Sequence, residues 1–355
     1  MISKNFCSAP WSSISIDPNG QAKICCISKN HTDFKNFNQI LTDNIFVDVR
    51  NSVINNQQHD NCTVCWKRES NSSSDEFDSM RSIFQHDFFY DLTNSNTAKL
   101  EYLDLRWSNT CNLNCVYCGP GYSSKWASML NLKKTFRIMP ELTDQHVATL
   151  KTVLLAGGEP FLIKENFQLL EKCLQINPDV KIEITTNLTQ IHHSEMYQLL
   201  KKFNNVRFIV SFESIEERFE YIRNGACWKE FLNNLNLLYA DFKNIQFNMV
   251  YFPLSAGGIS DAISLALNYT SSKNIFIVSQ NDGELFDKLG IESVQYLKDK
   301  NTKFADTLDV ILRNRLLDQV NLMNTTSAVT YLEKYCQFDQ LTNQNHKELF
   351  KELYQ

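Results

Sequence analysis

Three closely spaced cysteines constrain this 355-residue chain more than any other feature. Cys111, Cys115 and Cys118 form a C-x3-C-x2-C pattern. A [4Fe–4S] electron carrier uses four cysteines, one per iron, so three cysteines leave one iron without a protein ligand. An open coordination position lets a metal bind and activate another molecule. The pattern therefore indicates a site of chemistry; the alternative, a zinc site, needs a fourth Cys or His, which would have to come from a distant part of the chain.

The triad lies between two predicted strands. Residues 101–106 carry the apolar side chains Tyr102, Leu103 and Leu105, which favours a strand that ends just before the cysteines. Residues 152–156 are apolar and predict a second, buried strand, which ends in the turn Gly157-Gly158-Glu159-Pro160. Both motifs are therefore expected at the carboxyl ends of strands, where parallel α/β sheets bind their ligands.

The cysteine triad and the GGEP turn, in this order, resemble the two markers of the radical S-adenosylmethionine (SAM) superfamily. The resemblance implies that the open iron binds the amino and carboxylate groups of SAM. It implies that an electron from the cluster cleaves SAM to methionine and a 5′-deoxyadenosyl radical, which abstracts a hydrogen atom from a substrate. Cys111, Cys115 and Cys118 are then the catalytic cluster ligands.

Strands and amphipathic helices alternate along the middle of the chain. Met196, Leu199, Leu200 and Phe203 recur with helical spacing, and βαβ units predict a parallel sheet. Six units are too few for a closed eight-fold barrel, so we expect an α/β fold with a partial (β/α)6 TIM-like barrel, as the resemblance also implies. The expected strands span residues 101–106, 152–156, 181–186, 206–212, 245–251 and 274–279. The expected domains are a cysteine-rich module with a β-hairpin (1–66), a Ser/Asn-rich connector (67–98), the barrel (99–285) and a mainly helical carboxyl-terminal extension (286–355).

Several residues near these strand ends are candidates for binding SAM. Gly157 and Gly158 allow close backbone approach, so that the turn can offer acceptors to the methionyl amine, while Glu159 adds an acceptor and Pro160 stiffens the exit. Tyr117, between two of the cysteines, either lies near the adenine, as the resemblance implies, or packs the loop.

The remaining candidates follow later strands. Asn187 could bind ribose hydroxyls or the SAM carboxylate, or cap a helix. Ser211 and Glu213 occupy a segment that reads Ser-x-Asp in the family, and the glutamate puts the role of Glu213 in doubt. Arg223 lies in a segment resembling one whose arginine pairs with the SAM carboxylate; the alternative is a surface arginine. The family's Asp-x-x-Arg near the carboxyl end reads Asp339-Gln-Leu-Thr342 here, so no role is carried over to it.

The amino-terminal region carries a second cysteine group. Cys7 precedes a predicted strand and a turn at Gly20, Cys25-Cys26 follow, and Cys62 and Cys65 close the region. The C-x12-G-x4-C spacing followed by C-x2-C resembles the twitch module, or half of the related SPASM domain, which carries auxiliary clusters and which here precedes the barrel. The resemblance implies an auxiliary [4Fe–4S] cluster on the four thiolates of Cys7, Cys25, Cys62 and Cys65. Cys26 could replace Cys25, and four cysteines in two pairs also fit zinc.

Composition narrows the class of protein. A net charge of −5 gives no case for a broad nucleic-acid surface, and no stretch of about 20 apolar residues indicates a membrane span. The amino terminus lacks the apolar region of a signal peptide. Eleven cysteines without such a signal favour metal ligation in a reducing cytoplasm over a disulfide framework.

The sequence thus predicts a cytoplasmic radical SAM oxidoreductase or modifying enzyme with an auxiliary cluster and an outside reductant, a ferredoxin or flavodoxin. The expected substrate is a peptide or protein; a small molecule or sugar is the alternative. Two other hypotheses remain: a non-catalytic zinc-binding interaction protein, and a SAM-binding electron carrier that makes no product.

Overall fold

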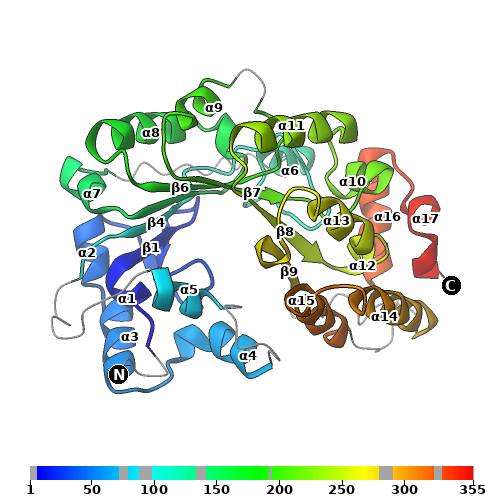
Figure 1. Cartoon of the computed structure of the whole chain (residues 1–355), viewed down its shortest axis with the longest axis horizontal. Helices are drawn as coiled ribbons and strands as arrows, with labels where there is room; N and C mark the ends of the chain where they lie inside the picture. Colours follow the sequence, from blue (N-terminus) through cyan, green and yellow to red (C-terminus); the bar gives the residue numbers. More distant parts are fainter. Residues whose placement is uncertain are drawn as a thin grey trace. The chain divides into compact units, whose positions relative to one another are not determined.

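The computed structural model describes residues 6–71, 79–87, 98–132, 141–191, 194–279, 291–323 and 330–354. The chain forms two compact units (Figure 1). The first contains residues 1–110, 135–184 and 194–206, and the second contains residues 111–134, 185–193 and 207–355.

The first unit is built on a mixed sheet with the order β3-β2-β1-β4-β5-β6. β1, β4, β5 and β6 run parallel, whereas β2 and β3 are antiparallel to their neighbours. Ile14, Leu103 and Val153 share a register and are fully buried, as continuous apolar runs in parallel strands require. The strands are β1 (Ser13–Ile16), β2 (Gln21–Lys23), β3 (Thr32–Asp33), β4 (Tyr102–Leu105), β5 (Thr152–Leu155) and β6 (Lys181–Thr186).

Helices join the strands of this sheet, and several of them begin at a capping side chain. Asp43 accepts a hydrogen bond from Ile45 N and begins α3, and Thr143 with His146 forms a capping box at the start of α7. In Figure 1, α7, α8 and α9 lie along strands β4 to β6. The helices are α1 (Ala9–Ser12), α2 (Phe37–Leu41), α3 (Asn44–Ile54), α4 (Thr63–Asn71), α5 (Met80–Asp87), α7 (Asp144–Thr149), α8 (Lys164–Ile176) and α9 (Glu195–Leu200).

The second unit contains three parallel strands, β7 (Val206–Ser211), β8 (Ile245–Tyr251) and β9 (Ile275–Ser279). An aromatic cluster of Phe212, Phe219 and Phe231 packs its core, with ring centroids of Phe219 and Phe231 4.7 Å apart. Its first helices are α6 (Ser124–Met129), α10 (Glu216–Ile222), α11 (Trp228–Asp241), α12 (Pro253–Ala256) and α13 (Ile259–Ala266).

Further helices complete the second unit after residue 290. The Arg315 guanidinium donates to the carbonyl of Ile275 at 2.8 Å, which fixes α15 to β9. Arg218 pairs bidentately with Glu352 at 2.6 and 2.8 Å, so that α10 holds the end of the chain. The helices are α14 (Ile291–Ala305), α15 (Val310–Asn321), α16 (Thr330–Thr342) and α17 (His346–Leu349).

The predicted α/β fold with alternating strands and helices is confirmed, and each expected strand matches an observed one within a residue or two. One feature was not foreseen: β1 pairs in parallel with β4, so the amino-terminal hairpin extends the main sheet. The expected connector contains the end of α4 and all of α5, and residues 72–78 and 88–97 of it lie outside the described residues. No helix in the described ranges has the length and apolar character needed to cross a membrane.

Candidate active site

The cysteine loop of the second unit is held by the segment that follows it. Trp126 Nε1 donates to the Cys115 carbonyl at 2.8 Å, and Ser123 Oγ donates to the Leu113 carbonyl at 2.6 Å. Ser123 also caps α6 by accepting from Trp126 N. Cys118 N donates to Cys115 O at 2.9 Å, which closes a tight turn around the last two cysteines. The Ser-Ser-Lys-Trp segment therefore fixes the backbone on which the thiols are carried.

The end of α10 supports the opposite side of the loop. Val116 N donates to Ile222 O at 2.9 Å, and Asn114 N donates to Asn224 O at 3.1 Å. Gly225 follows with a φ of 97°, a conformation that favours glycine. These bonds place the start of the Arg-Asn-Gly segment directly beside the cysteines.

Two buried side chains and the half-buried Tyr117 form a charged network beside the loop. Arg223 Nε donates to Glu213 Oε2 at 2.9 Å and Nη2 donates to Oε1 at 2.6 Å, and both side chains are almost completely buried. Tyr117 OH donates to Glu213 Oε1 at 3.0 Å and accepts from Arg223 Nη2. The Tyr117 ring packs edge-on against Phe252. Arg223 is thus buried, which excludes the surface arginine that the sequence left open, and its Nη1 still carries two donors.

Burial and nearby donors have opposite effects on the ionisation of the triad thiols. Burial raises the pKa of the Cys115 thiol, and the nearby Arg223 cation opposes that rise. Leu113 N donates to Cys111 Sγ at 3.4 Å. A backbone donor and a cation favour the thiolate form, which is the form that ligates metals.

Asn187 joins the same neighbourhood. Its Nδ2 donates to Asn112 Oδ1 at 3.1 Å and lies 4.0 Å from Cys111 Sγ, and its Oδ1 accepts from Thr189 N at 3.0 Å. Asn187 is therefore tied to the cysteine loop and is not a helix cap, since α9 begins after Ser194. Ser211 ends β7 and is half-buried.

The GGEP turn packs in the first unit against the residues that lead into Cys111. Gly158 N donates to Ser108 O at 3.1 Å, and Glu159 N donates to Thr110 O at 2.8 Å. A Cβ at Gly158 would lie 2.0 Å from Thr110 O, and Gly157 has a φ of 109°. Only glycines allow this contact between two backbones. Glu159 is fully buried and accepts from Phe161 N at 3.5 Å, and Pro160 begins a short 3-10 helix.

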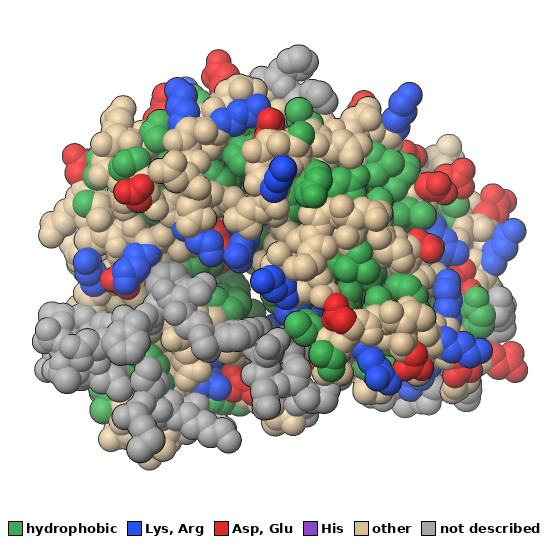
Figure 2. All heavy atoms as spheres, in the orientation of Figure 1, with side chains coloured by type: hydrophobic (Ala, Val, Ile, Leu, Met, Phe, Trp, Pro, Cys, Tyr) green, Lys and Arg blue, Asp and Glu red, His purple; other side chains and the backbone are tan. Residues whose placement is uncertain are grey.

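One face of the sheet in the first unit is polar. Asp104 accepts from Ser15 Oγ at 2.8 Å and pairs with Arg106, and Glu183 pairs with Lys181 at 2.8 Å. A third pair, Lys23 with Asp17 at 3.5 Å, lies on β2 and the end of β1. Figure 2 shows basic and acidic side chains together in the part of the view that contains these strands. The three cations of this polar face are thus each matched by a carboxylate.

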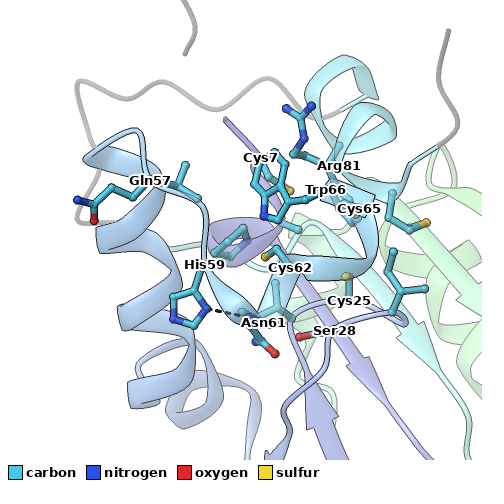
Figure 3. A pocket seen from close by; sticks show the side chains of 17 residues that line it. Cys7, Cys25, Ser28, Gln57, His59, Asn61, Cys62, Cys65, Trp66 and Arg81 are labelled. Atoms are coloured by element: carbon cyan, nitrogen blue, oxygen red, sulfur yellow. Dashed lines mark hydrogen bonds between the residues drawn. The ribbon is translucent and has the colours of Figure 1, made fainter. Parts of the chain in front are cut away.

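The four amino-terminal cysteines line one cavity in the first unit. Cys7, Cys25, Cys62 and Cys65 all line a pocket of about 540 Å³, a volume that includes space open to solvent. Figure 3 shows the sulfurs of Cys7, Cys25 and Cys62 turned toward this space. Cys26 is not among its lining residues and interacts electrostatically with Asp104 and Arg106 of the polar face.

Burial is the main cause of the raised pKa values of these thiols. It raises the pKa of Cys62 to about 12 and that of Cys26 to about 11, and it also raises the pKa of Cys7, Cys25 and Cys65. Neighbouring cysteines raise the pKa of Cys7 and Cys25 further, whereas the Arg81 cation lowers that of Cys7. Thiols that resist ionisation in an apolar pocket become good ligands when a metal replaces their protons.

Both cysteine sets fit iron–sulfur clusters by donor chemistry and surroundings. Asn114, inside the triad loop, is fully buried, and neither atom of its amide has a hydrogen-bond partner in the described part of the chain. Such an orphaned amide points to a missing polar partner at this site. Among the described residues, no group of three or more His, Cys, Asp and Glu side chains is already arranged as the ligands of a metal ion. The ligand sets are therefore inferred from residue type, loop position and neighbours.

Four of the nine residues predicted to bind SAM lie with the triad in the second unit and contact its loop or one another: Tyr117, Asn187, Glu213 and Arg223. Sequence reasoning missed the supporting roles of Trp126, Ser123 and Asn112. The Ser-Ser-Lys-Trp segment was a usable signal, because serine before a helix is a capping residue. Nothing in the sequence pointed to Asn112 or Phe252.

Sequence comparison finds similarity over the middle part of the chain. A family model described as "Radical SAM superfamily" matches residues 105–266. A GTP 3′,8-cyclase of Clostridium botulinum (strain Hall) is 28% identical over 177 residues, which cover 49% of this chain and 55% of the relative. A GTP 3′,8-cyclase of Campylobacter lari is 22% identical over 175 residues, covering 48% and 52%. The chain thus matches about half the length of these curated relatives.

Solved structures resemble the chain more weakly. Native anSMEcpe with bound AdoMet has a TM-score of 0.42 and 19% identity, and the match covers 64% of this chain and 62% of that chain. Streptococcus suis SuiB bound to S-adenosylmethionine has a TM-score of 0.41 and 18% identity, covering 59% and 48%.

Proposed function

We propose that this chain is a radical SAM enzyme with two iron–sulfur sites, one in each compact unit. The observation that carries the proposal is the buried Glu213–Arg223 pair, joined by Tyr117 of the three-cysteine loop, within the segment that matches the family model. Bound by Cys111, Cys115 and Cys118, a [4Fe–4S] cluster would supply the electron that splits SAM into methionine and a 5′-deoxyadenosyl radical, which takes a hydrogen atom from the substrate.

The protein's own residues bind and orient SAM. Glu213 fixes the Arg223 guanidinium through two hydrogen bonds, which leaves the Nη1 donors for a carboxylate such as that of SAM. The Glu213 carboxylate contacts two of the three guanidinium nitrogens, Nε and Nη2. Asn187 adds a side-chain amide beside Cys111. Burial of the network excludes water and strengthens each of these contacts.

The second site is the four-cysteine cavity. Four thiolates would saturate a [4Fe–4S] cluster, which favours electron transfer over binding of substrate. Cys25 lines the cavity, whereas Cys26 interacts with charged residues of the polar face. This difference supports Cys25 as the ligand. Cys26 also connects the four-cysteine cavity with the polar face, because it follows Cys25 directly and lies near Asp104. An auxiliary cluster there would be close to any substrate held on the polar face.

We propose a peptide or protein as the substrate class. Lys23, Arg106 and Lys181 are each paired with a carboxylate on the polar face, which offers balanced donors and acceptors, as peptide groups require. A nucleoside triphosphate, the kind of molecule named for the matched cyclases, needs cations that are free to meet its phosphates. An outside one-electron reductant, a ferredoxin or flavodoxin, and a reducing cytoplasmic setting complete the proposal.

Anaerobic reconstitution of the full chain tests this function. We expect about eight irons per chain, four per cluster, and formation of 5′-deoxyadenosine when SAM and dithionite are added. The triple variant Cys111→Ala/Cys115→Ala/Cys118→Ala should keep about half of the iron and form no 5′-deoxyadenosine.

Different results would support the other hypotheses. Zinc in the amino-terminal site and no cleavage of SAM would favour a metal-binding interaction protein. Cleavage of SAM without deuterium transfer from any deuterated peptide into 5′-deoxyadenosine would favour an electron carrier. Deuterium transfer from a small molecule alone would contradict the peptide proposal.

A further inference from the structure

A buried indole N–H faces the four-cysteine cavity. Trp66 Nε1 is inaccessible to solvent and has no hydrogen-bond partner among the residues that the structure describes. Trp66 lines this cavity together with Cys7 and Cys62, and Figure 3 shows the three side chains in the same part of it. Leaving such a donor unpaired costs about 1–3 kcal/mol, so a buried N–H of this kind calls for an acceptor.

The cysteine sulfurs of the cavity are the candidate acceptors for the Trp66 N–H. The cavity contains the thiols of Cys7, Cys25, Cys62 and Cys65, which become thiolates when they ligate a metal. Asn61 also lines the cavity and has an unpaired Nδ2, but Figure 3 shows its side chain turned toward Ser28, away from the cysteines. The inference therefore rests on Trp66.

The indole is held in this orientation. The Arg81 guanidinium stacks over its ring, 4.8 Å from the centroid. Arg81 is fixed in turn by Glu69, with Nε 2.9 Å from Oε1, and donates to the Phe6 carbonyl at 3.3 Å. A ring clamped by a fixed cation cannot rotate freely, so the N–H direction is set before any cluster binds.

We propose that Trp66 Nε1–H donates a hydrogen bond to a sulfur of the auxiliary cluster and thereby raises its reduction potential. This inference rests on the proposed cluster at Cys7, Cys25, Cys62 and Cys65. Reduction adds an electron to an already anionic group, and a donor aimed at its sulfur stabilises the more negative state. A raised potential favours this site as an acceptor of electrons.

The test isolates the auxiliary cluster in the full chain. The parent variant carries Cys111→Ala/Cys115→Ala/Cys118→Ala, so that only one cluster contributes, and its potential is titrated by EPR. Trp66→Phe keeps a ring and removes the N–H; we expect it to lower the reduction equilibrium constant about tenfold, which is about 59 mV for a one-electron couple. Trp228→Phe is the matched control, since this half-buried indole lies in the second unit, stacked on Phe231, and should leave the potential unchanged.

A spectroscopic readout keeps the inference testable if Trp66→Phe assembles poorly. The parent variant, grown with tryptophan labelled with 15N in the indole, should show a 15N coupling to the reduced cluster in pulsed EPR. Absence of that coupling, or an unchanged potential in an assembled Trp66→Phe cluster, overturns the inference and leaves the proposed function intact. A parent variant that binds no iron overturns the auxiliary cluster itself.

Discussion

At the scale of single residues, the Glu213–Arg223 pair sets the orientation in which the guanidinium can bind an anionic ligand. Burial lowers the pKa of the Arg223 guanidinium, while Glu213 and Tyr117 raise it, and the net direction is upward. Two charges taken out of water are tolerable only as a well-bonded pair, and this pair has bidentate geometry. Glu213 is thus a positioning residue whose carboxylate orients the guanidinium for an anion.

Replacing Glu213 by glutamine tests this role. The amide keeps the shape of the carboxylate but leaves the Arg223 charge uncompensated in a buried site, so the free energy of unfolding should fall by about 3 kcal/mol, measured by urea denaturation. SAM affinity, measured by equilibrium dialysis on the reconstituted protein, should fall as well because the guanidinium loses its orientation. Glu217→Gln, an exposed neighbour, is the control. A Glu213→Gln variant as stable as the parent contradicts the account.

At the scale of elements, the contact between the turn after β5 and the exit from β4 links the two sequence motifs. The two hydrogen bonds to Ser108 and Thr110 fix the backbone that continues into Cys111. The turn thus acts through backbone atoms, which explains why glycine is needed where the strands end.

Gly158→Ala should break this contact. Its Cβ would meet the Thr110 carbonyl oxygen at 2.0 Å, and this backbone atom, which accepts from Glu159 N, cannot move away as the end of a flexible side chain does. We expect a loss of about 1–3 kcal/mol in the free energy of unfolding and fewer irons at the triad after reconstitution. Gly121→Ala, whose Cβ would meet nothing within 4 Å, should match the parent in both measurements. Equal iron content in Gly158→Ala would disprove the link between turn and triad.

The positions of strands and helices were easier to predict from the sequence than the strands and side chains that they contact. β5 follows from the apolar run Val153 to Leu155, because buried parallel strands need such runs. The pairing of β1 with β4 did not follow, since alternation predicts a strand but not its neighbour. The bond from Arg218 to Glu352 joins residues 134 apart in sequence, and no local pattern encodes such a contact.

In the candidate site, too, local motifs could be predicted from the sequence and long-range contacts could not. The cysteines and the GGEP turn were recognisable because their chemistry depends on spacing within a loop. The partner of Arg223 was not, because Glu213 and Tyr117 reach it from different loops. Arg223 was expected to pair with the SAM carboxylate, and the structure adds the carboxylate that holds it in place.

At the scale of the whole molecule, the buried thiols tie stability to pH. Both units contain them: burial raises the pKa of Cys173 to about 12 in the first, and it raises that of Cys115 in the second. Each of these thiols stays protonated in the folded chain at a pH where the unfolded chain ionises it. The folded state binds more protons there, so stability falls as pH rises.

Cys173 allows this linkage to be measured without touching a proposed ligand. Its stabilising effect is fully present below the unfolded thiol pKa of 9.0 and is lost progressively from there to about 12. Between pH 8 and pH 10 the metal-free, reduced protein should therefore lose about 1.4 kcal/mol of stability from this thiol alone, and the urea midpoint should fall. Cys173→Ala, although less stable at pH 8, should show a smaller fall, whereas removing the exposed Cys227 provides the matched control. A Cys173→Ala protein with the same pH dependence as the parent would show that this thiol ionises as readily inside the core as outside it.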